Sequence, residues 1–77
     1  MQEFKISLRS FRQVQEFVAL SSAENFPVYV GNPQQIISGK DLMGMFSLDY
    51  SRPLQVRAEC SEEEFHLFRQ KTAKFLI

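Results

Sequence analysis

The sequence predicts a single α+β domain in which one antiparallel sheet carries helices on one face. Apolar and polar residues alternate, with the period of a half-buried strand, over residues 4–8, 26–30 and 54–58. Apolar residues recur at helical spacing after two capping serines, Ser10 and Ser61. Strands that flank helices in this order pack most economically as one antiparallel sheet with the helices on one face. A chain of 77 residues has room for one core, so we expect one domain.

The first strand, in which Phe4, Ile6 and Leu8 alternate with polar residues, leads into a helix over about residues 11–24. This helix begins with a capping box, Ser10-Phe11-Arg12-Gln13. The Ser10 hydroxyl can accept a hydrogen bond from the Gln13 backbone N–H while the Gln13 side chain reaches back. The apolar face of the helix then follows the i, i+3, i+4 rule through Val14, Phe17 and Val18.

A hairpin is predicted after this helix. Its first arm is the alternating run of Phe26, Val28 and Val30, and its second arm is Ile36 and Ile37. The turn between the arms is predicted by Gly31-Asn32-Pro33-Gln34, since Asn-Pro initiates turns.

The second half of the chain adds two helices and one strand. A short helix is expected over residues 42–48, then a loop over 49–53 and a strand over 54–58. A capping serine followed by carboxylates at the positive end of the helix dipole starts a last helix that continues to the C-terminus. That start is Ser61-Glu62-Glu63-Glu64. The predicted order is β-α-β-β-α-β-α.

Charge and composition argue against several function classes. Nine basic and nine acidic residues give zero net charge, so no basic surface is expected for nucleic acid or an anionic membrane. Cys60 and His66, the single cysteine and the single histidine, supply too few ligands for a metal site and no oriented nucleophile pair. We therefore expect no enzyme, no metal and no cofactor. The first residues lack the apolar run of a signal peptide, so a cytoplasmic location is expected.

The predicted short helix is apolar on nearly all sides, which is unusual for a helix on the surface of a small domain. Its apolar residues cannot all face one core, and clustered exposed apolar side chains usually mark a binding surface. These residues are Leu42, Met43, Met45, Phe46 and Leu48. The alternatives are that the loop over 49–53 covers them or that a second copy of the chain does. The zero net charge favours such a homodimer.

The same segment resembles the second-helix signature of the HPr family of phosphocarrier proteins, Lys-Ser-(Ile/Leu)-(Met/Leu)-Gly-x-Met-Ser-Leu. Here it reads Lys40-Asp41-Leu42-Met43-Gly44-Met45-Phe46-Ser47-Leu48. The predicted order of elements is also that of the family. The resemblance implies one HPr-like domain over residues 1–77, an open-faced sandwich of a four-stranded antiparallel sheet and three helices. It also implies a place among the proteins of the sugar phosphotransferase system.

HPr proteins carry a phosphoryl group on a histidine at the start of their first helix. The register of the resemblance puts Ser10 at that histidine, Arg12 at the neighbouring arginine and Gln13 at a proline. A serine phosphoester is too stable to be passed on readily, so the resemblance implies a regulatory, protein-binding relative rather than a carrier. Two alternatives stay open: a genuine phosphocarrier that accepts phosphate from enzyme I at Ser10 or another residue, and a self-associating structural module.

The resemblance also assigns a regulatory position and a partner surface. Asp41 stands where some HPr proteins have a serine that is phosphorylated for regulation. Its carboxylate can cap the helix, or it can be a weak, permanent imitation of phosphoserine. The positions that match the family's partner surface are Phe11, Arg12, Leu42, Met43 and Phe46.

Overall fold

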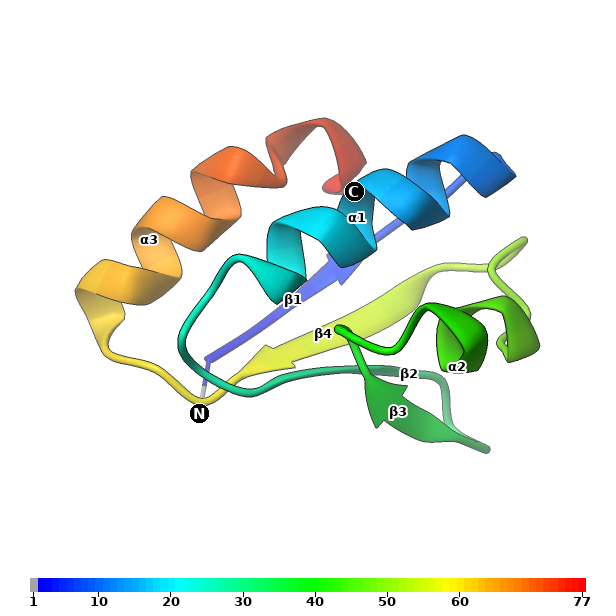
Figure 1. Cartoon of the computed structure of the whole chain (residues 1–77), viewed down its shortest axis with the longest axis horizontal. Helices are drawn as coiled ribbons and strands as arrows, with labels where there is room; N and C mark the ends of the chain where they lie inside the picture. The colour runs from blue at the N-terminus through cyan, green and yellow to red at the C-terminus, as the bar shows by residue number, and fades with distance from the viewer. Residues whose placement is uncertain (1) are drawn as a thin grey trace.

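The computed structural model describes residues 2–77, which form a four-stranded antiparallel sheet with helices packed on one face (Figure 1). The predicted α+β class is confirmed. In chain order the elements are β1 (Gln2–Ile6), α1 (Phe11–Ser22), β2 (Val28–Gly31), β3 (Ile36–Ser38), α2 (Leu42–Ser47), β4 (Leu54–Ala58) and α3 (Glu62–Lys71), followed by a short 3₁₀ helix, η1 (Ala73–Phe75).

The sheet has the strand order β1-β4-β2-β3, and every neighbouring pair is antiparallel. Phe4 of β1 lies opposite Val56 of β4, and Val56 lies opposite Val30 of β2. Because side chains alternate across a strand, this register gathers the apolar side chains on the helix side and the polar ones on the other side. The sheet is therefore covered on one face and open on the other.

The core lies between the sheet and the helices, and it is rich in phenylalanine. The Phe68 ring of α3 is fully buried, and its centroid lies 5.7 Å from that of Phe26, 6.0 Å from Phe4 and 6.3 Å from Phe17. Such tilted and edge-to-face pairs are the favoured arrangement of aromatic rings. The strands contribute Phe4, Ile6, Val28, Val30, Leu54, Val56 and Ala58 to the same cluster.

Some predicted boundaries differ from the observed ones. Helix α1 ends at Ser22, two residues before the predicted end. Leu8 and Phe26 are buried as expected, but both lie outside the strands. Pro27 has no N–H to give to the sheet, so β2 begins only at Val28.

The prediction that the last helix continues to the C-terminus is wrong. Helix α3 ends at Lys71, and the chain turns through η1 so that Leu76 forms a β-bridge with Ile6. The Ser7 N–H donates to the Phe75 carbonyl at 2.8 Å, and the Ile77 N–H donates to the Lys5 carbonyl at 3.3 Å. These bonds occupy the free edge of β1, whose backbone groups would otherwise lack partners in the protein.

Candidate functional site

The start of α1 is held by Ser10, the residue that stands at the phosphate-carrying position in the predicted register. Ser10 has extended backbone angles, φ −154° and ψ 162°, and its Oγ accepts from the Gln13 backbone N–H at 3.2 Å. The Gln13 side chain also reaches back, but it accepts from the Arg9 N–H at 2.7 Å, one residue before the cap. Ser10 is thus the N-cap that the sequence predicts.

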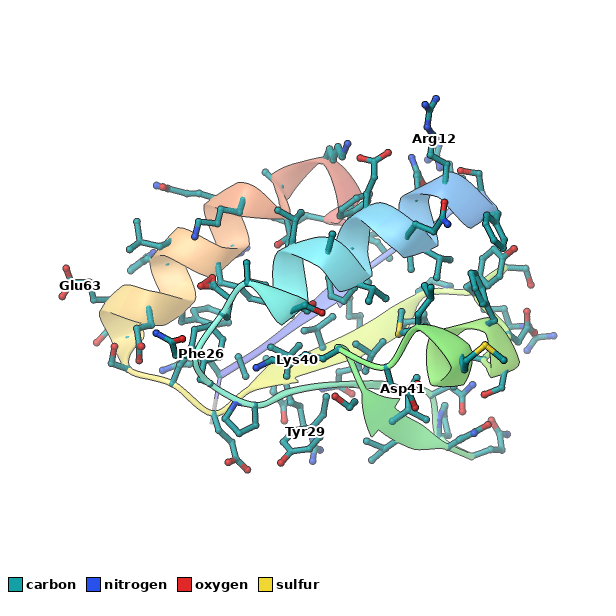
Figure 2. All side chains as sticks on the ribbon, in the orientation of Figure 1. Arg12, Phe26, Tyr29, Lys40, Asp41 and Glu63 are labelled. Atoms are coloured by element: carbon teal, nitrogen blue, oxygen red, sulfur yellow. The ribbon has the colours of Figure 1, made fainter. Side chains whose placement is uncertain are left out.

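Two arginines flank this cap. Both Arg9 and Arg12 are exposed, and neither forms an ion pair within residues 2–77. Figure 2 shows the Arg12 side chain projecting into solvent from the first turn of α1. The positive end of the α1 dipole adds to these charges, so this end of the molecule is locally cationic although the net charge is zero.

Asp41 is the N-cap of helix α2, and its Oδ1 accepts from the Gly44 backbone N–H at 3.1 Å. A side chain at Gly44 would conflict with this cap, because a Cβ there would lie 2.6 Å from Asp41 Oδ2. Glycine is unfavourable inside a helix, so its presence here is explained by the room it leaves for the cap. The structure thus confirms that Asp41 acts as a helix cap.

The side chains of α2 divide into a buried and an open set. Met45 and the following Leu48 are buried in the core, whereas Met43 is 79% exposed. Leu42 and Phe46 are half-buried at the edge of the core. The prediction that this helix cannot bury all its apolar side chains is confirmed.

An aromatic stack joins the two helices. The rings of Phe11 in α1 and Phe46 in α2 lie 4.5 Å apart between centroids and only 10° from parallel, while Phe11 remains 55% exposed. Figure 1 shows the start of α1 and the end of α2 at the same end of the molecule. Sequence reasoning placed both residues on one surface but gave no sign that they touch, since pairs so far apart in sequence follow from tertiary packing alone. We call the exposed region formed by Phe11, Arg12, Leu42, Met43 and Phe46 the α1–α2 surface.

The single cysteine and the single histidine lie apart from this surface. Cys60 is half-buried between β4 and α3, and burial raises the pKa of its thiol, with a further contribution from the Glu64 and Glu24 carboxylates. His66 is exposed on α3. Within residues 2–77 no group of three or more potential ligands lies close enough to hold a metal ion. The helices of the same residues also include none long and apolar enough to cross a membrane.

Comparison with known proteins supports the fold class. No family profile and no curated protein matches the sequence. Among solved structures, the chain is similar to the crystal structure of HPr-C-His from Thermoanaerobacter tengcongensis, with a TM-score of 0.70 and 26% sequence identity. The match covers 99% of this chain and 100% of that one. The structure is therefore an HPr-like open-faced sandwich, as predicted.

Proposed function

We propose that this chain is a regulatory protein-binding module with an HPr-like fold, and that it is neither a phosphocarrier nor an enzyme. Its binding site is the α1–α2 surface. The observation that carries the proposal is that the stacked rings of Phe11 and Phe46 are partly exposed, on the same surface as Met43, which is 79% exposed. A small domain gains nothing in its own stability from leaving such side chains in water, whereas a partner would bury them.

The composition of the surface suits a protein partner. Aromatic residues and arginine dominate the binding energy of most interfaces, and methionine adapts its shape to different partners. The stack between Phe11 and Phe46 restricts both rings before binding, which reduces the entropy lost on association. Because Arg9 and Arg12 have no ion-pair partner within residues 2–77, the best-matched partner has an apolar site with an acidic rim.

The chemistry of Ser10 argues against phosphate transfer. A carrier needs a bond to phosphorus that breaks easily, as in a phosphorylated histidine, whereas a phosphoserine ester is stable. The Ser10 oxygen also already accepts the hydrogen bond that caps α1. We therefore propose that the start of α1 serves binding and not transfer.

The partner is tested by titrating isotope-labelled protein with enzyme I and with sugar-specific transporter domains of a phosphotransferase system. We expect the amide resonances of α1's first turn and of α2 to shift. A Met43→Ala variant should weaken the interaction, and Leu67→Ala on α3, which removes another exposed side chain, is the matched control. If no resonance in either helix moves, phosphotransferase proteins are not the partners.

A carrier function remains the second candidate, because the similar structure is an HPr protein. Incubation with phosphoenolpyruvate and enzyme I, followed by intact-mass measurement, separates the two functions. A binding module keeps its mass. A gain of one phosphate would overturn the proposal. An acid-stable gain that the Ser10→Ala variant loses would be a phosphoester of Ser10, whereas an acid-labile gain would lie on another residue.

A further inference from the structure

The open face of the sheet, opposite the helices, carries side chains in two cross-strand rows. One row runs from Lys5 to Gln55, Gly31 and Ile36, and the other runs from Glu3 to Arg57, Tyr29 and Ser38, each residue opposite the next in the register. Figure 2 shows Tyr29 on the side of β2 away from α1 and α3. This face is therefore separate from the α1–α2 surface.

Gly31 of the first row has no side chain and takes part in a groove of about 370 Å³ on this face. Tyr29, Ile36, Pro33 and Pro53 also line the groove. Gly31 is required by the close approach of the β2–β3 connection, because a Cβ there would lie 2.5 Å from the Gln35 carbonyl oxygen and 2.9 Å from Ile36 Cγ1. The volume of the groove is within the range of about 300–1,000 Å³ that is typical of small-molecule sites.

Of the charged side chains around the groove, the acidic one is paired and one basic one is not. The only carboxylate in the two rows, Glu3, is held by its neighbours: Oε2 lies 2.8 Å from Arg57 Nε, and Oε1 accepts from Gln55 Nε2 at 2.6 Å. Lys5 also lines the groove but has no ion-pair partner within residues 2–77. One free ammonium group thus stands beside an apolar hollow.

We propose that this groove binds a small organic carboxylate with a flat apolar body. The ring system lies over Gly31 between Tyr29 and Ile36, and the carboxylate pairs with the Lys5 ammonium. An apolar lining with one or two polar groups that fix orientation is the usual design of a small-molecule site. The groove volume suits one or two fused rings.

Neither edge of the sheet is well suited to binding a peptide as an added strand. The free edge of β1 is already occupied by the C-terminal turn through the Leu76 bridge to Ile6. The opposite edge strand, β3, has only three residues, which offer few backbone hydrogen bonds to an added strand. The size of the groove and its single unpaired cation therefore favour a small anion.

The test uses 2-naphthoate as the probe and 2-naphthamide, its neutral counterpart, as the comparison. Amide resonances of the isotope-labelled chain are followed during titration. We expect saturable shifts in β1, β2 and β4 around the groove, with a dissociation constant on the order of 1 mM for so small a ligand. The amide should bind about fivefold more weakly, as should naphthoate to a Lys5→Gln variant.

Two further variants complete the test. Ile36→Glu places a carboxylate on the rim, and because Ile36 is 61% exposed the fold is expected to tolerate it. This variant should abolish binding, whereas Arg69→Gln, which removes one charge on exposed α3, should leave it unchanged. The proposal is overturned if naphthoate causes no saturable shifts at the groove, if its shifts map to the α1–α2 surface, or if Lys5→Gln binds as well as the original chain.

Discussion

Individual side chains determine which chemistry is open to this fold, and Ser10 is the clearest case. Its hydroxyl caps α1 at the place where the predicted register puts a phosphate-carrying histidine. The sequence predicted both the cap and the helix start correctly, because a capping serine acts through its immediate neighbours. It could not predict that Gln13 would reach Arg9, since that choice depends on the path of the chain before the helix.

Cys60 gives a residue-scale prediction about reactivity. Burial disfavours its thiolate, and the carboxylates of Glu64 and Glu24 add to the effect, so the pKa of the thiol lies above its usual value. Because the thiolate is the nucleophile, iodoacetamide at pH 8 should alkylate the folded chain more slowly than the chain unfolded in urea. Mass spectrometry over time measures both rates. Equal rates would show that the folded environment does not disfavour ionisation of the Cys60 thiol.

The same shift sets the sign of a pH effect on stability. A thiol whose pKa is higher in the folded state contributes stability that is present below the pKa of the unfolded thiol, about 8.5, and is lost as the pH rises through the folded pKa. The Cys60→Ser variant lacks this titration, so its urea midpoint should fall less steeply in the alkaline range. If the urea midpoints of both proteins fall equally with pH, the loss of stability is due to groups other than Cys60.

At the scale of elements, local sequence signals fixed the starts of the helices better than their ends. The capping serines at 10 and 61 and Asp41 were all found where expected, because caps are short-range interactions. The end of α3 was missed, since the bridge between Leu76 and Ile6 joins residues at opposite ends of the chain. No periodic pattern in the last residues contains that information.

The cap of α2 separates two roles that the sequence left open for Asp41. If the carboxylate acts by accepting the Gly44 N–H, then Asp41→Ala should lower the free energy of unfolding by about 0.5–2 kcal/mol. Asp41→Asn keeps a side-chain oxygen that can accept the same hydrogen bond and removes only the charge. It should therefore lower the free energy of unfolding much less than Asp41→Ala does. Urea unfolding measures both. An equal loss in the two variants would mean that the charge, and not the hydrogen bond, stabilises α2.

The Asn variant also tests the imitation of phosphoserine. Its cap is retained while its charge is lost, so any weakening of partner binding by Asp41→Asn is due to the charge. The first oxygen of the carboxylate is engaged by Gly44, which leaves one oxygen for a partner.

At the scale of the whole molecule, the fold class could be predicted because alternation and helical spacing assign most core residues correctly. The α1–α2 surface was predicted in part, as exposed apolar residues that one small core cannot accommodate. The Phe11–Phe46 stack and the groove over Gly31 were not predictable in this way. Both form only when separate elements pack, because the residues of the groove come from β1, β2, β3 and β4 and the loops beside them.

The core itself gives the last prediction, because two adjacent apolar side chains of α3 differ sharply in burial. Phe68 is fully buried and its ring meets those of Phe4, Phe17 and Phe26, whereas Leu67 is 52% exposed. Phe68→Ala should lower the free energy of unfolding by about 3–5 kcal/mol. The total free energy of unfolding expected for a domain of this size is roughly 4–12 kcal/mol, so this is a large part of it. Leu67→Ala should change stability by less than about 0.5 kcal/mol. Urea unfolding followed by circular dichroism measures both, and a loss below about 1 kcal/mol for Phe68→Ala would mean that this ring is not the centre of the core.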